Sequence, residues 1–167
     1  GGNLYTRLTA RENIAYFGKL QGMQPAEIEH SIANFVDILD MHSIIDRKTG
    51  GFSQGERMKV SLARALVHSP DYILLDEPTN GLDVLTTQAV RALLLRLKAE
   101  GKCVIFSSHL MHEVANLCDR VAIVAQGKVV IEGDQSTVIK KANKNTMEDA
   151  FVHFAYGEGT NIPENLR

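Results

Sequence analysis

A short apolar run that ends in two acidic residues constrains the fold of this chain more than any other feature. Residues 72–75 read Tyr-Ile-Leu-Leu, and Asp76 and Glu77 follow directly. A continuous apolar run of this length is typical of a strand that is buried on both faces of a parallel sheet. Because ligands of open α/β sheets bind just beyond the carboxyl ends of the strands, we expect the two carboxylates to lie beside a ligand.

From residue 72 onward the pattern alternates between strands and helices, whereas before residue 70 it consists of helices separated by a loop at residues 41–52. The expected helices span residues 10–22, 25–39, 57–68, 84–99 and 110–117, and the expected strands span 72–75, 103–106, 121–125 and 129–132. Strands that alternate with helices in this way predict an α/β fold with a mostly parallel sheet. The last two strands are expected to form a hairpin.

The composition excludes several classes of protein. The 167 residues include 18 Lys and Arg against 20 Asp and Glu, with no Trp. This balance argues against a nucleic-acid-coating protein and against a polybasic membrane binder. No apolar run approaches the roughly 18 to 20 residues of a membrane-spanning helix. The two cysteines, Cys103 and Cys118, do not form a Cys-x-x-Cys pair and are expected to be reduced and buried.

The acidic pair suits metal-assisted hydrolysis. One carboxylate can hold Mg²⁺ through water, and the other can deprotonate an attacking water. His109 follows the next predicted strand, so we expect it at the same sheet edge as Glu77, where it could bind a terminal phosphate or the catalytic water. The alternatives are an ordinary solvated strand end and a surface or capping histidine. His109, His112 and Glu113 lack the zinc-binding spacing of two histidines at i and i+4 on one helix.

A second candidate site precedes the helix expected from residue 57. Ser53 can cap this helix, and Gly55 allows a close approach of the backbone, so the loop could bind an anion at the helix N-terminus. A plain helix cap after a glycine-rich turn is the alternative.

Taken together, these segments resemble the motifs of the ATP-binding-cassette (ABC) ATPases, in the same order and at the same spacing. Residues 52–56, Phe-Ser-Gln-Gly-Glu, resemble the signature loop, and residues 72–78 resemble the Walker B strand. Residues 80–83, Asn-Gly-Leu-Asp, resemble the D-loop, and residues 107–109, Ser-Ser-His, resemble the switch-histidine loop. The resemblance implies a P-loop NTPase-type domain that binds ATP and Mg²⁺.

The resemblance also implies roles for single residues. Asp76 would bind Mg²⁺ through water, Glu77 would be the general base, and His109 would contact the γ-phosphate. In a dimer, Ser53 would contact the γ-phosphate of the nucleotide held by the opposite subunit, together with the rest of its loop. Asp83 would connect the two sites across that dimer.

The remaining residues of the signature-like loop are Gln54, Gly55 and Glu56. Gly55 would contact the same γ-phosphate as Ser53. Gln54 replaces the first glycine of the usual Leu-Ser-Gly-Gly-Gln loop, and Glu56 replaces its glutamine. Either change could weaken the site, because the first adds a side chain and the second adds a negative charge beside an anion.

The sequence contains no Gly-x-x-x-x-Gly-Lys-Ser/Thr loop, which in the family lies upstream and wraps the phosphates. We therefore expect an N-terminally truncated domain. Residues 1–70 would be the helical (signature) subdomain, and residues 71–167 the C-terminal part of the RecA-like α/β core, with a C-terminal helix and a frayed tail. The isolated chain would bind ATP poorly and leave apolar surface uncovered.

The resemblance implies an ATP-hydrolysing subunit of an ABC transporter. Residues 8–13 and 52–55 resemble the sodium-exporter (NatA-like) subgroup, which indicates an exporter, with Na⁺ as a candidate cargo. The expected partners are a second nucleotide-binding domain, in a homodimer or heterodimer, and a separate permease at the cytoplasmic face of the membrane, with no nucleic acid.

One alternative is a catalytically incompetent remnant or dimerising module. Another is a DNA-maintenance ATPase of the SMC type, which the lack of heptads between residues 22 and 53 disfavours.

Overall fold

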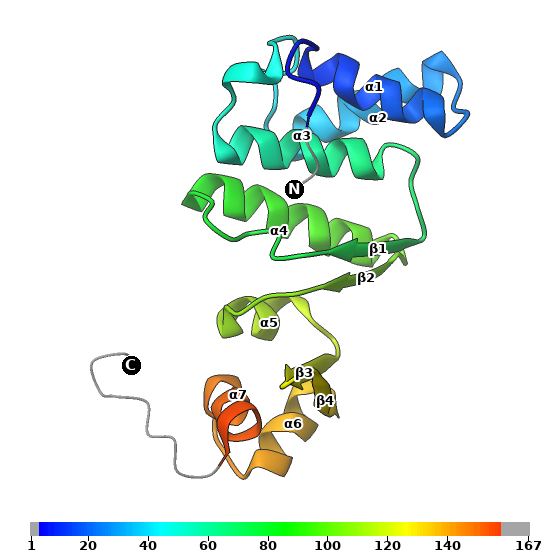
Figure 1. Ribbon diagram of the computed structural model, residues 1–167. Coiled ribbons are helices and arrows are strands. Elements are labelled where there is room, and N and C mark those ends of the chain that lie inside the picture. The colour runs from blue at the N-terminus through cyan, green and yellow to red at the C-terminus, as the bar shows by residue number, and fades with distance from the viewer. Residues whose placement is uncertain (1–3, 158–167) are drawn as a thin grey trace. The chain divides into compact units, whose positions relative to one another are not determined.

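The computed structural model describes residues 4–157 of the chain (Figure 1). The chain divides into two compact units, Gly1–Ser108 and His109–Arg167. The subdomain boundary predicted at residue 70 lies inside the first unit and stays a prediction.

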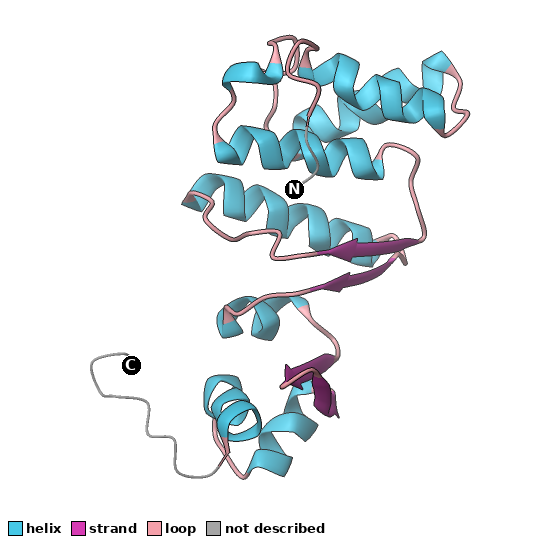
Figure 2. Cartoon of the chain, viewed as in Figure 1, coloured by secondary structure: helices cyan, strands magenta, loops and turns pink. Residues whose placement is uncertain are grey.

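The first unit is built around three helices that pack on one another. They are α1 (Ala10–Leu20), α2 (Pro25–Ile38) and α3 (Gln54–Leu66), and α1 contacts both of the others (Figures 1 and 2). Ile14, Ile32 and Val60 are fully buried, one from each helix. The loop between α2 and α3 contains the short 3₁₀ helix η1 (Thr49–Gly51).

The helix predicted from residue 57 begins three residues earlier. Ser53 caps α3, and Glu56 completes a capping box with it, so the helix starts at Gln54. Gly55 has a low helix propensity, which made the sequence favour a later start. Gly55 is buried against Asp83 and Thr86, and this packing offsets the cost of placing a glycine in the helix.

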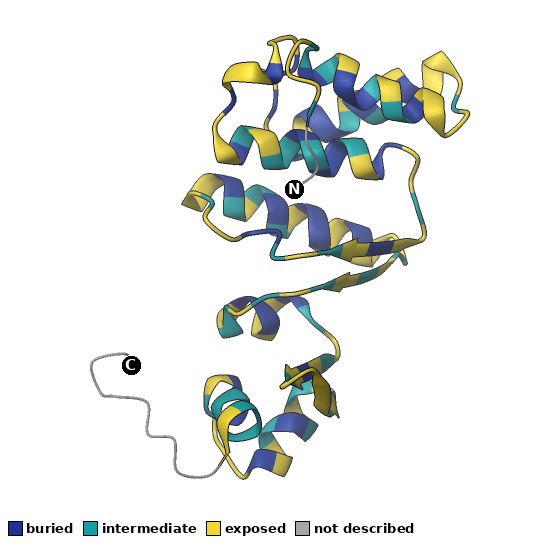
Figure 3. Ribbon diagram, viewed as in Figure 1, coloured by how far each residue is buried: buried dark blue, intermediate teal, exposed yellow. Residues whose placement is uncertain are grey.

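The two strands that follow pair in parallel. Strand β1 (Tyr72–Leu75) aligns with β2 (Cys103–Phe106), and Leu75 lies opposite Phe106. Helix α4 (Val84–Ala99) connects them and packs against β2. The expectation that these strands are buried on both faces is wrong. Tyr72 and Leu74 are 78% and 77% exposed, whereas Ile73 between them is 4% exposed, because α4 covers one face and no described element of the first unit covers the other (Figure 3).

Cys103 lies on the same uncovered face. It is exposed, contrary to the expectation of a buried thiol, and Cys118 in the second unit is partly buried. Both cysteines are free thiols, as predicted.

The second unit contains α5 (Met111–Leu117), the antiparallel hairpin of β3 (Val121–Ala125) and β4 (Lys128–Gly133), α6 (Gln135–Ala142) and α7 (Met147–Tyr156). Its core consists of Val114, Ile123, Val138, Ala142, Met147 and Ala150. The predicted hairpin is confirmed, and the tail expected to fray lies largely outside the described residues.

The α/β fold class is confirmed, with one parallel and one antiparallel pair of strands among residues 4–157. Within the same residues, no helix combines the length and the apolarity that crossing a membrane requires.

Candidate functional site

The acidic pair lies at the carboxyl end of β1, beside a serine that follows β2. The Ser107 hydroxyl donates a hydrogen bond of 2.6 Å to Asp76 Oδ1, and the Glu77 N–H donates one of 2.8 Å to the same hydroxyl oxygen. The parallel register explains the contact, since Asp76 and Ser107 each follow the last paired residue of their strand. Ser107 therefore holds both acidic residues, one through its carboxylate and the other through its backbone.

No sequence motif indicated a separate role for Ser107, which lies in the segment that resembles the switch-histidine loop. Two strands of equal length that pair in parallel bring the residues after them together. Comparing Asp76 with Ser107, each one position beyond its strand, would have found the contact.

The backbone of Glu77 is left-handed, with φ of +47°. Residues other than glycine rarely adopt this conformation, and where they do, the surrounding structure compensates for the strain. The hydrogen bond from the Glu77 N–H to Ser107, and the bond of 3.1 Å that the Asn80 N–H donates to the Glu77 carbonyl, hold this conformation. Strained residues of this kind cluster at functional sites, which favours a functional role for Glu77.

The N-terminus of α3 has the capping box of Ser53 and Glu56 at its first turn. Ser53 Oγ accepts a hydrogen bond from the Glu56 N–H at 3.2 Å, and the Ser53 N–H donates to the Glu56 carboxylate at 2.8 Å. A hydroxyl that accepts such a bond can still donate its own proton to an anion. Ser53 is exposed, and the positive end of the α3 dipole lies behind it.

The extra charge of Glu56 is neutralised within the chain. Arg47 Nη1 lies 2.8 Å from Glu56 Oε1, and the Arg47 guanidinium lies over the ring of Phe52 at 5.2 Å. The backbone N–H of Ser53, and then Arg47, lower the pKa of the Glu56 carboxyl. Both oxygens of the carboxylate are thus engaged within the chain, one by Arg47 and the other by the N–H of Ser53.

The turn after the acidic pair lies directly against this N-terminus. Asp83 caps α4, accepting hydrogen bonds from the Thr86 N–H at 2.9 Å and the Thr86 hydroxyl at 2.7 Å, and these bonds lower the pKa of Asp83. A Cβ atom on Gly55 would lie 2.9 Å from Thr86 Oγ1 and 3.2 Å from Asp83 Oδ2. Gln54 Nε2 donates to the Asn80 carbonyl at 3.1 Å.

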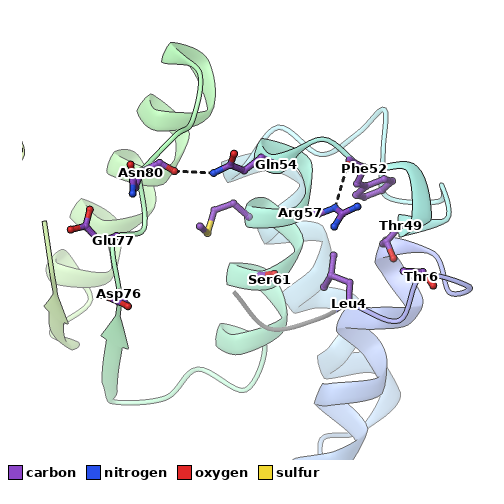
Figure 4. Close-up of a pocket in the computed structure, with 11 residues that line it drawn as sticks. Leu4, Thr6, Thr49, Phe52, Gln54, Arg57, Ser61, Asp76, Glu77 and Asn80 are labelled. Carbon is purple, nitrogen blue, oxygen red and sulfur yellow. Dashed lines mark hydrogen bonds between the residues drawn. The ribbon is translucent and has the colours of Figure 1, made fainter. Parts of the chain in front are cut away.

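Gln54 and Asn80 also line a cavity of about 760 Å³ in the first unit. Figure 4 shows Asp76, Glu77 and Asn80 on one wall and Gln54 and Arg57 on the opposite wall. The structure therefore brings the acidic pair and the signature-like loop to the same cavity. His109 begins the second unit, so its predicted place beside Glu77 stays a prediction.

Asp76 suits a magnesium ion that is held mainly by water and phosphate oxygens. Its carboxylate is exposed, and within residues 4–157 only Oδ1 accepts a hydrogen bond, from Ser107. No cluster of three or more metal-ligating side chains occurs among those residues. Mg²⁺ commonly keeps several waters and takes one or two carboxylates together with substrate phosphates, so a single Asp76 is compatible with it.

Comparison with known proteins shows that the chain is similar to ABC transporter ATP-binding proteins. A model of the family described as ABC transporter matches residues 2–80. The chain is 41% identical, over 149 residues, to the ABC transporter ATP-binding protein NatA of Bacillus subtilis (strain 168), covering 89% of the chain and 61% of that relative. It is 34% identical, over 139 residues, to the Nod factor export ATP-binding protein I of Rhizobium sp. (strain N33), covering 83% of the chain and 46% of that relative.

A third relative is the linearmycin resistance ATP-binding protein LnrL of Bacillus subtilis (strain 168), with 31% identity over 144 residues, covering 86% of the chain and 46% of LnrL. The chain thus spans between about half and three fifths of the length of these relatives. A solved structure of an ATP binding subunit of an ABC transporter superposes with a TM-score of 0.83 at 23% identity, covering 91% of this chain and 64% of that one. At 23% identity, this superposition shows that the two folds are alike and says nothing more about function.

Proposed function

The chain belongs to the family of ABC transporter ATP-binding proteins, and we propose that it supplies the signature loop and the hydrolytic acidic pair of an ATP-driven exporter. In this proposal, residues 72–78 are the Walker B strand and residues 52–56 the signature loop. The observation that carries it is the Ser107 bridge, which holds Asp76 and Glu77 together at the carboxyl end of a parallel strand, beside a cavity of about 760 Å³.

The proposed roles are those that the family resemblance implies, and the positions of Asp76 and Glu77 at the end of β1 support them. Asp76 would hold Mg²⁺ through water, with the carboxylate that the Ser107 hydroxyl binds. Glu77 accepts a proton from the attacking water, and its constrained backbone fixes the approach of its side chain. Bound Mg²⁺ would neutralise charge on the phosphates of ATP. His109 contacts the γ-phosphate, as the family resemblance implies.

The second half of the site faces a nucleotide held by another domain. Ser53 donates its hydroxyl proton to that γ-phosphate, supported by the dipole of α3 and by the close backbone of Gly55. Asp83, adjacent to Gly55, connects this site with the one across the dimer. We propose a second nucleotide-binding domain and a separate permease as partners, with the chain bound through the permease at the cytoplasmic face of the membrane.

Export is supported by the relatives whose names state it, such as the Nod factor export protein. The proposal of Na⁺ as cargo depends only on the resemblance of residues 8–13 and 52–55 to the sodium-exporter subgroup. A non-catalytic dimerising module is the second candidate, and the test below distinguishes it from an ATPase.

The test measures Mg-ATP hydrolysis by the chain and by a fusion that places the phosphate-binding segment of a relative before residue 1. Glu77→Gln is made in both, and Glu148→Gln, an exposed carboxylate in the second unit, is the matched control. We expect turnover by the fusion and a loss of about 100-fold or more in Glu77→Gln, which is the usual contribution of a general base. A folded fusion without turnover would favour the non-catalytic module. Turnover by the chain alone, abolished by Glu77→Gln, would show that ATP is held without that loop.

A further inference from the structure

The side chain of Gln54 connects two segments that are distant in the sequence. It is the first residue of α3, and its Nε2 donates a hydrogen bond of 3.1 Å to the carbonyl of Asn80, 26 residues further along the chain (Figure 4). A glycine at this position could not make this bond. The residue that departs from the usual signature loop therefore connects that loop to the turn after the acidic pair.

The turn is shaped to receive the Gln54 side chain. Gly81 has a φ of +69°, and a Cβ atom there would lie 2.8 Å from Gln54 Nε2 and 3.4 Å from its Cδ and Oε1. The side-chain amide thus lies on the face of Gly81 where any other residue would carry its Cβ. The Gln54 amide thus packs against Gly81 and donates its hydrogen bond to the carbonyl of the preceding residue, Asn80.

Gly55, the next residue of α3, makes a second close contact, with the first turn of α4. Gly55 is buried, and a Cβ atom there would lie 2.9 Å from Thr86 Oγ1, the hydroxyl that donates to Asp83. Two successive residues of α3 therefore contact the segment that runs from Asn80 to the first turn of α4. Movement of the Ser53 loop would be transmitted to Asp83 through both contacts.

We propose that Gln54 is a positioning residue that couples the signature-like loop to the D-loop-like turn and so holds Ser53 and Asp83 in one arrangement. The purpose of the coupling rests on the proposed function, whereas the contact itself is testable without nucleotide. An amide suits the task because it donates to the Asn80 carbonyl, whereas a glutamate carboxylate of the same size would repel that oxygen.

The first test is amide hydrogen exchange on the ligand-free chain. The N–H groups of Asn80 and Leu82 donate within the turn, at 3.1 and 3.3 Å, so their exchange reports its opening. We expect Gln54→Ala and Gln54→Glu to accelerate both amides about three- to tenfold, which corresponds to the loss of one hydrogen bond. Gln21→Ala, at an exposed glutamine after α1, is expected to change neither. Unchanged exchange in both Gln54 variants would overturn the proposal.

A double-variant comparison separates this contact from general loosening. Gly81→Ala strains the backbone and displaces the Gln54 amide, so we expect Gln54→Ala to cause no further acceleration in the Gly81→Ala background. Equal effects of Gln54→Ala in both backgrounds would show that the amide does not act through this turn.

Turnover of the fusion then distinguishes positioning from a structural role. Because Gln54 would act through Ser53 and Asp83, Gln54→Ala is expected to lower kcat about tenfold with little change in KM. Faster exchange with unchanged kcat would overturn the positioning role. A fusion without any turnover would instead count against the proposed function, and the exchange result would still stand.

Discussion

The Ser107 hydroxyl lies 2.6 Å from the Asp76 carboxylate and accepts the N–H of the next residue, Glu77. A single side chain from the end of β2 thus supports both members of the acidic pair at the end of β1. If the pair is catalytic, its geometry depends on the pairing of the two strands and on this serine.

Ser107→Ala should remove both hydrogen bonds and leave the acidic pair without its support. We expect a loss of about 1 to 2 kcal/mol in the free energy of unfolding, because one bond is to a charged acceptor and the other is to backbone. Chemical denaturation of Ser107→Ala, with Ser43→Ala at an exposed loop serine as control, measures this difference. Ser107→Thr keeps the hydroxyl and should recover part of the loss. Equal stabilities of the Ser107 and Ser43 variants would contradict the bridge.

The left-handed backbone of Glu77 predicts an unusual preference for glycine. Glu77→Gly should be more stable than Glu77→Ala by about 1 kcal/mol, since glycine adopts a positive φ without the steric cost of a Cβ. At Glu29, inside α2, the order should reverse, and the glycine variant should be less stable by about 1 kcal/mol. Thermal or chemical unfolding of the four variants checks both signs. The same order at both positions would show that Glu77 carries no strain.

The Arg47–Glu56 pair predicts a pH dependence of stability. The folded-state pKa of Glu56 is lowered below its ordinary value of 4.5. Its contribution to stability is therefore complete above that ordinary value and is lost as the pH falls through the lower pKa of the folded state. Glu56→Gln keeps the capping geometry and removes the charge, and we expect it to be less stable by about 0.5 to 1 kcal/mol at neutral pH.

Denaturation of Glu56→Gln and of the unmodified chain across acidic pH measures this dependence. The difference between them should disappear in acid, and Arg47→Ala should show the same trend because it removes the other partner. A stability difference that grows as the pH falls would contradict the ion pair.

The uncovered face of the parallel strands predicts a difference in thiol reactivity. Cys103 is exposed and lies in register with Tyr72, while Cys118 packs beside the core of the second unit. A maleimide should therefore label one thiol rapidly and the other much more slowly. Cys103→Ser should abolish the fast phase, as mass spectrometry of the labelled chain would show. A fast phase that persists in Cys103→Ser would assign the fast thiol to Cys118 and contradict the prediction.

Local features of the sequence determined the elements and the chemistry at their ends. Strands 72–75 and 103–106 match the structure to the residue, because apolar runs bounded by polar residues are local signals. The capping box of Ser53 and Glu56 was equally readable and would have placed the start of α3 correctly. The position of Asp76 and Glu77 immediately after a strand followed directly from this pattern.

Only the tertiary structure decided which distant residues meet. The contacts of Ser107 with Asp76, of Gln54 with Asn80 and of Arg47 with Glu56 depend on strand register and helix packing, which no local pattern specifies. The same holds for the exposed face of β1, since an apolar run looks the same whether one face or both faces are covered. Burial and long-range contacts arise from packing over the whole unit, whereas capping, periodicity and strand ends arise from neighbouring residues.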